Sequence, residues 1–106
     1  MVNVIDINIQ KSIKKYLSVI SKQYRIEKAF LYGSHASGKA DEDSDIDLAI
    51  VSPSFTGNRF VDNVELGRLT WGIDTRIEPI AFTPDDFNEL FFAQEIKKRG
   101  IEITFN

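Results

Sequence analysis

The chain has 106 residues, of which 42% are hydrophobic and 27% charged, with a formal net charge of −3 and no cysteine. One hydrophobic core suffices for this length, so residues 1–106 are predicted to form a single domain. No run approaches the ~20 apolar residues of a membrane span, and no basic start suggests a secretory signal. Disulfides and thiolate zinc sites are excluded, and the acidic balance argues against a long nucleic acid partner. We expect a soluble, cytoplasmic protein.

The first half of the chain is predicted to contain one helix and two strands. Apolar residues at spacings of three and four indicate an amphipathic helix over residues 8–23. A strand is expected over residues 26–32, where Gly33 ends it, and another over residues 46–51, before Ser52 and Pro53. The segment between the two strands, from Gly33 to Asp43, is small and polar.

The second half continues with helix, strand, helix and strand. A short helix is expected to bury Val61, Val64, Leu66 and Leu69, and a strand over residues 73–82 places Pro79 at an edge or bulge. Thr83 and Pro84 start a last helix. Its predicted buried face comprises Phe87, Leu90, Phe91 and Ile96; Gly100 ends it before a strand over residues 101–105, and Trp71 and Phe82 are expected in the core. The predicted class is α/β (α+β), a mixed sheet of three or four strands flanked by helices.

Two phosphate- or metal-binding motifs fit the polar segment poorly. Gly33, Gly38 and Lys39 have the spacing of a P-loop, but Ala40 has no hydroxyl for magnesium and acids follow where a long helix would begin. The alternating acids of residues 41–45 imitate the start of a calcium-binding EF-hand loop. Isoleucine and serine, however, stand where that loop needs glycine and a bidentate glutamate.

A third interpretation fits better. It places Gly33 and Ser34 at the end of a strand, a short helical turn after them, and Asp45 and Asp47 at the start of the next strand. Because side chains alternate along a strand, these two acids point to one face, where they could share cations. Glycine lets a triphosphate approach the backbone, and the serine hydroxyl can hydrogen-bond its phosphates.

This segment resembles the minimal nucleotidyltransferases of the DNA polymerase beta superfamily. Their signature is Gly-Ser, ten residues and Asp-x-Asp, matched here by Gly33-Ser34 and Asp45-Ile46-Asp47. The residues Gly38-Lys39-Ala40 and 44–50 are also similar to the family. The resemblance implies the nucleotidyltransferase fold, two Mg²⁺ ions held by Asp45 and Asp47, and a triphosphate held by Gly33, Ser34 and Lys39.

The family also uses a third carboxylate on a later strand, to hold metal and help deprotonate the acceptor. Asp74 and Glu78 are the candidates, and on one strand they would lie roughly 13 Å apart, too far to serve one metal pair together. Glu78 is preferred because only a short strand separates it from Thr83, although the family usually has aspartate here. Asp74 stays open as the alternative.

The resemblance implies transfer of a nucleoside monophosphate, most plausibly AMP from ATP, to an acceptor hydroxyl. Stand-alone chains of this kind often act as the antitoxin of a toxin-antitoxin pair and adenylylate a HEPN-type toxin, so a partner protein and a homo- or hetero-oligomer are expected. Two alternatives remain. The chain could neutralise a toxin by binding alone, or it could be a subunit that modifies an aminoglycoside-type small molecule.

Overall fold

The computed structural model describes residues 5–105 and contains a mixed sheet in the order β3-β2-β1-β4. Its strands are β1 (Lys28–Tyr32), β2 (Ile46–Val51), β3 (Ile77–Phe82) and β4 (Ile101–Glu102). β1 runs antiparallel to both β2 and β4, whereas β2 and β3 are parallel. The predicted fold class, a mixed sheet flanked by helices, is confirmed.

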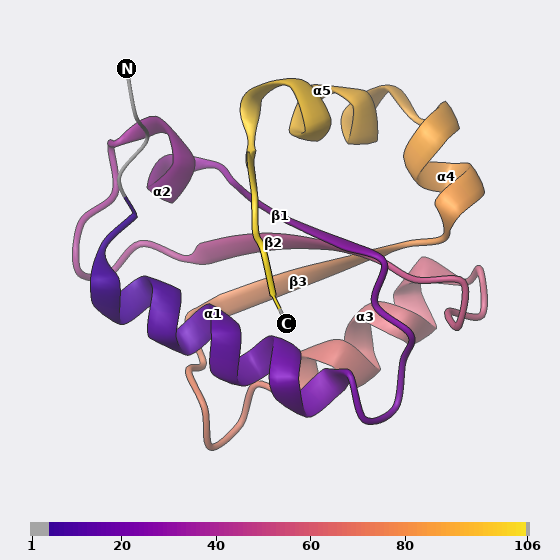
Figure 1. Cartoon of the computed structure of the whole chain (residues 1–106), viewed down its shortest axis with the longest axis horizontal. Helices are drawn as coiled ribbons and strands as arrows, with labels where there is room; N and C mark the ends of the chain where they lie inside the picture. The colour runs from indigo at the N-terminus through magenta and orange to yellow at the C-terminus, as the bar shows by residue number, and fades with distance from the viewer. Residues whose placement is uncertain (1–4, 106) are drawn as a thin grey trace.

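Helices cover both faces of this sheet (Figure 1). They are α1 (Ile7–Ile20), α2 (Ser34–Ser37), α3 (Arg59–Arg68), α4 (Pro84–Glu89) and α5 (Phe91–Arg99). α1 and α3 pack with one face in the larger hydrophobic cluster, and α4 and α5 pack on the opposite face in a second cluster. Within residues 5–105, no helix combines the length and apolarity needed to cross a bilayer.

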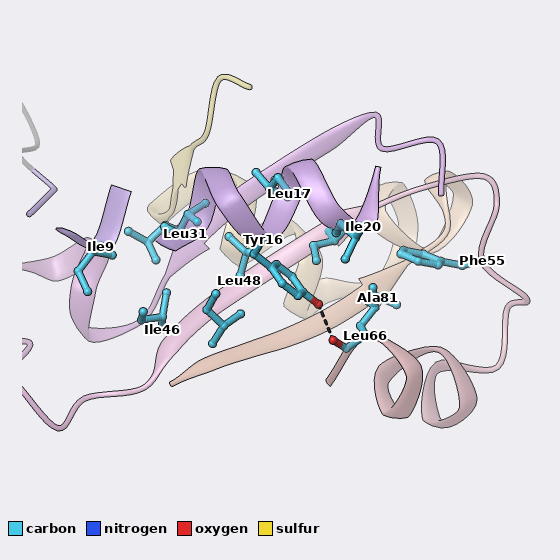
Figure 2. Packing of buried hydrophobic residues seen from close by; sticks show 14 residues of the cluster. Ile9, Tyr16, Leu17, Ile20, Leu31, Ile46, Leu48, Phe55, Leu66 and Ala81 are labelled. Atoms are coloured by element: carbon cyan, nitrogen blue, oxygen red, sulfur yellow. Dashed lines mark hydrogen bonds between the residues drawn. The ribbon is translucent and has the colours of Figure 1, made fainter. Parts of the chain in front are cut away.

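α1 supplies much of the larger cluster, for the reason its sequence pattern indicated. Asp6 caps its start by accepting hydrogen bonds from the backbone N–H groups of Asn8 and Ile9. The stripe spaced by three and four is buried: Ile9, Ile13, Tyr16, Leu17 and Ile20. Figure 2 shows Tyr16 reaching across the cluster, where its hydroxyl donates a 2.6 Å hydrogen bond to the Leu66 carbonyl at the end of α3. This bond satisfies a buried phenol and fixes α1 against α3.

β2 lies in the middle of the molecule and is buried on both faces. Ile46, Leu48 and Ile50 belong to the cluster under α1, while Ala49 and Val51 belong to the cluster under α4 and α5. Asp47 alternates with Leu48 and therefore lies on the α4/α5 side of the sheet. The position of Asp47 is thus fixed by a strand that packing holds from both sides.

Several sequence-based predictions need correction, beginning with β3 and α3. β3 begins at Ile77 rather than at residue 73, because residues 73–76 form a turn in which the Ile77 N–H donates to the Asp74 carbonyl. α3 forms, yet Val61 and Val64 are 50% and 58% exposed, and Trp71, expected in the core, is 75% exposed. The face of α3 that meets the sheet carries Asp62 and Leu66 instead.

The last predicted helix is in fact two helices. Leu90 takes an extended conformation, with ψ 135°, between α4 and α5, and the Gln94 side-chain amide donates to the free carbonyls of Phe87 and Asn88. After this break the buried face of α5 is formed by Ala93 and Ile96, and Phe91, which was predicted to be buried, is 79% exposed. The predicted closing strand of residues 101–105 shortens to two residues.

Candidate functional site

The turn after β1 requires glycine at position 33 for two reasons. Gly33 has φ 75°, a left-handed conformation that other residues rarely adopt. A Cβ atom at this position would also overlap Oδ2 of Asp47. The Gly33 carbonyl accepts from the N–H groups of Ala36 and Ser37, which starts the one-turn helix α2 at Ser34. The predicted Gly-Ser turn and short helix are confirmed, and the turn touches the predicted acid.

The strand register lines up three polar side chains across the sheet. Tyr32 of β1 is the pairing partner of Asp47 of β2, and Asp47 is the partner of Glu78 of β3. On their strands all three alternate with residues of the cluster under α1, so they share the α4/α5 face. We refer to Tyr32, Asp47 and Glu78 as the polar row. Asp45 lies just before β2, rather than in it, and is exposed.

The acids of this region act on one another electrostatically. Burial, and then the charge of Asp45, raise the pKa of Asp47, while the nearby His35 opposes the shift. Burial, followed by Asp45 and Asp47, also raises the pKa of Glu78. Burial raises the pKa of Tyr32 to about 12, with Asp47 and Glu78 adding to the effect. Neither shift has a hydrogen bond among its causes, so among residues 5–105 no donor stabilises the charge of these two paired carboxylates.

Asp74, the alternative third acid, is engaged elsewhere. Its Oδ2 lies 2.7 Å from Nη2 of Arg76 and accepts a 2.7 Å hydrogen bond from the Ser12 hydroxyl of α1. These contacts, with that of Arg76 the largest, lower the pKa of Asp74 to about 2. The geometry therefore brings Glu78, and not Asp74, to Asp47.

The remaining candidates lie on the loop beyond α2. Lys39 is exposed, and its backbone N–H donates to the Ser34 carbonyl at 3.0 Å, which places its side chain just beyond the turn. Nε2 of His35 lies 3.3 Å from the Ser44 carbonyl, so the ring joins α2 to the segment that leads into Asp45. Sequence reasoning overlooked Tyr32, although its place directly before Gly33 and the strand alternation could have indicated it.

The donor set suits a hard divalent cation. Within residues 5–105, no group of three or more His, Cys, Asp or Glu side chains is already arranged as a metal cage. Magnesium does not need one, because it is commonly bound by one or two carboxylates, waters and the phosphates of its substrate. Adjacent carboxylates with unfavourable charge, beside a turn that lets phosphate approach, fit a magnesium ion that arrives with a nucleotide.

Comparison with known proteins decides the family. The model of the nucleotidyltransferase domain family matches residues 12–104. The chain belongs to this family. Nucleotidyltransferases act on a nucleoside triphosphate with the help of a divalent metal, which agrees with the donor set described above.

Two archaeal proteins and one solved structure are similar to this nucleotidyltransferase. "Putative protein adenylyltransferase MJ0604" of Methanocaldococcus jannaschii is 44% identical over 46 residues, which are 42% of this chain and 46% of that protein. The chain thus spans less than half of that relative. "Putative protein adenylyltransferase MJ0141" of the same organism is 29% identical over 100 residues, covering 92% of this chain and 97% of that protein. The crystal structure of a putative nucleotidyltransferase from Sulfolobus solfataricus superposes with a TM-score of 0.68 at 18% identity, over 91% of this chain and 79% of that chain, and supports the fold.

Proposed function

We propose that this nucleotidyltransferase moves AMP from ATP to a hydroxyl group of a partner protein, with release of pyrophosphate. The observation that carries the proposal is the strand register, which sets Asp47 beside Glu78, next to the Gly33–Ser34 turn. Asp45 stands close enough to raise the pKa of both acids. These are the positions at which the family's carboxylates would serve a metal-bound triphosphate.

Each part of the site has a separate role in the proposed reaction. The Gly33–Ser34 turn and Lys39 hold the β- and γ-phosphates, and Asp45, Asp47 and Glu78 would hold two Mg²⁺ ions. When bound, these ions would supply positive charge to the attacking oxygen and to the leaving pyrophosphate. A bond forms between the acceptor oxygen and the α-phosphorus while the bond from that phosphorus to pyrophosphate breaks. The acceptor's proton passes to the carboxylate of Glu78, which acts as the general base.

A protein acceptor is favoured by two observations. Both similar archaeal proteins carry the name protein adenylyltransferase, and one of them matches this chain over nearly its whole length. A 106-residue domain also has little surface for enclosing a small acceptor. By the resemblance in sequence we propose that the acceptor is a HEPN-type toxin and that the chain is its antitoxin.

The direct test is incubation with magnesium, a host lysate and ATP labelled at the α-phosphate. We expect a labelled protein band with the wild type and none with Asp45→Asn/Asp47→Asn. ATP labelled at the γ-phosphate controls for kinases, since nucleotidyl transfer leaves no γ-label on the acceptor. Label on RNA or a small molecule instead would reject the protein acceptor, and absence of any transfer would reject the enzymatic proposal.

A second test separates catalysis from simple masking of the toxin. Co-expression of the HEPN-type protein identified by the label should be tolerated with the wild-type chain but not with Asp47→Asn. Protection by Asp47→Asn equal to that of the wild type would show that binding alone neutralises the toxin.

A further inference from the structure

Phe92 of α5 lies beside the polar row without being buried. Its ring meets Tyr32 edge-on, with centroids 5.8 Å apart and an interplanar angle of 86°. It also meets Phe82, at the far end of β3, at 6.5 Å. Since Tyr32 pairs with Asp47, one side chain separates Phe92 from the central acid of the row. Nevertheless 47% of Phe92 is exposed, so packing holds the ring in place while part of it faces solvent.

The geometry of the proposed reaction allows the nucleoside to lie on the side of the polar row where Phe92 is found. In nucleotidyl transfer the attacking and leaving oxygens lie roughly in line on opposite sides of the phosphorus. The Gly33–Ser34 turn follows β1 and Glu78 lies on β3, so this line runs across the strands. The nucleoside stays attached to the α-phosphate and must extend away from that line. It can extend either along the sheet towards Phe92 or outwards over the loop of residues 39–45.

The chemistry of the two directions differs. The outward loop exposes Asp41, Glu42 and Asp43, whose carboxylates provide no surface on which a nucleobase could stack. On the inward side, Phe92 is supported by Tyr32 and Phe82 and offers an apolar aromatic surface. A nucleobase gains from stacking on such a ring whichever base it is, and purines offer the larger area.

Resting on the proposed function, we propose that Phe92 forms the nucleobase subsite of the donor nucleotide and favours purines over pyrimidines. Because α5 begins only after the break at Leu90, the break places Phe92 at the first turn of a helix that packs on β1. The subsite is therefore built by the helix break that the sequence pattern did not indicate.

The test compares two ligands that differ in the presence of a nucleoside. Calorimetry measures binding of α,β-methylene-ATP and of tripolyphosphate, each with Mg²⁺, to the wild type and to Phe92→Leu. We expect Phe92→Leu to bind the ATP analogue on the order of tenfold more weakly and tripolyphosphate equally well. The preference for ATP over CTP in transfer assays should fall in parallel.

Two further variants control for general effects. Phe60→Leu makes the same change at a phenylalanine of α3 that is 77% exposed, and it should bind both ligands as the wild type does. Phe92→Tyr keeps the ring and should restore wild-type affinity. Thermal unfolding of each variant checks that Phe92→Leu is folded.

The outcomes distinguish this inference from the function on which it rests. If wild type and Phe92→Leu bind the ATP analogue equally, or if Phe92→Leu loses both ligands alike, the nucleobase subsite is wrong. The proposed function still stands in that case, provided that Asp47→Asn abolishes binding of tripolyphosphate. If the wild type binds neither ligand, the proposed function fails and the subsite fails with it.

Discussion

At the scale of single residues, Gly33 and Asp47 depend on each other. The Cβ of any other residue at position 33 would overlap Oδ2 of Asp47, and the positive φ adds backbone strain. The atom in the way is the end of a flexible side chain, so the chain can fold if Asp47 rotates. The turn and the carboxylate thus form one unit, in which the backbone sets where the acid points.

We therefore expect Gly33→Ala to reduce activity more than stability. The positive φ costs roughly 1 kcal/mol. Displacement of the Asp47 carboxylate by an ångström-scale rotation should lower kcat/KM by about 100-fold. Urea unfolding and initial rates measure the two effects. Gly38 also has a positive φ of 79°, with ψ 14° where Gly33 has −149°, and open space around its Cβ, so Gly38→Ala is the control for a left-handed glycine away from Asp47. Equal losses of activity in the two variants would contradict the coupling.

Asp47 should also destabilise the ligand-free protein. Its pKa is raised in the folded state by burial and by Asp45, so ionisation is less favourable there than in the unfolded chain. This cost appears as pH rises above the unfolded value of 3.8 and is complete above the folded pKa. Asp47→Asn should therefore raise the melting temperature at pH 7 while abolishing transfer. The gain should shrink as pH falls through the folded pKa of Asp47 and disappear below 3.8, and a variant less stable than wild type at pH 7 would refute this account.

Most residues of the candidate site could be proposed from the sequence because their spacing is local. Gly33, Ser34, Asp45 and Asp47 belong to one motif, and their strand and turn follow from alternation and from glycine. The choice between Asp74 and Glu78 required the register of β2 against β3, which is a contact between distant segments. Tyr32 could have been found from its place before Gly33 and from strand alternation, whereas Phe92 could not be assigned to the site, because aromatic residues in helices usually lie in the core.

At the scale of elements, an ion pair within the turn that leads into β3 is linked to α1 by a hydrogen bond. Asp74 binds Arg76 beside it and Ser12 of α1, and these contacts hold its pKa near 2. The difference from the unfolded value of 3.8 sets an upper bound of about 2.4 kcal/mol. Because the Arg76 side chain is 38% exposed, screening reduces this, and about 1 kcal/mol is expected.

Asp74→Asn should accordingly lower the free energy of unfolding by about 1 kcal/mol at pH 7. The pKa is lowered in the folded state, so the stabilisation is fully present above pH 4 and is lost as pH falls towards 2. Denaturant unfolding between pH 2 and pH 7 should show the two proteins converging at low pH. A difference that does not change with pH would mean that the ion pair is not its source.

Helices and strands were predicted well where periodicity and capping residues agreed. They were predicted poorly where tertiary contacts determined which residues are buried and where a helix ends. Asp6 and Thr83 cap α1 and α4, and the stripe of α1 is buried as expected. α3 is different, because its apolar Val61 and Val64 face solvent while Asp62 is buried and accepts from Thr56. Gly100 ends α5 with φ −81°, not in a left-handed turn; its Cβ would meet the carbonyls of Ile96 and Leu31. Such close approaches leave no periodic signal in the sequence.

β3 is an edge strand whose outward-facing positions offer no free N–H group to another strand. The outward positions are Ile77, whose N–H donates to Asp74, Pro79, which has no N–H, and Ala81, whose N–H donates to Asn63 of α3 at 2.7 Å. Another chain cannot readily add as a strand beside Glu78. Under the proposed function, an acceptor protein would therefore present its hydroxyl to the face of the sheet instead.

At the scale of the whole molecule, the proposed site would be incomplete until metal and nucleotide arrive together. The protein supplies a few mutually repelling carboxylates and no ready-made metal cage within residues 5–105, and its formal net charge is −3. Phosphate oxygens must complete the coordination of a magnesium ion. Binding of either component alone should then be weak, and binding of the two together should be strong.

This cooperation can be measured as a shift in melting temperature. Mg²⁺ with α,β-methylene-ATP at about ten times the dissociation constant should stabilise the protein by about 1.4 kcal/mol, or several degrees. Mg²⁺ alone, or the analogue with a chelator, should give much less. Asp45→Asn/Asp47→Asn should lose the shift. Glu42→Gln/Asp43→Asn, which removes the same charge from the neighbouring loop, should keep most of it. If both double variants lost the shift equally, general electrostatic attraction would explain the binding, and the specific role of Asp45 and Asp47 would have to be abandoned.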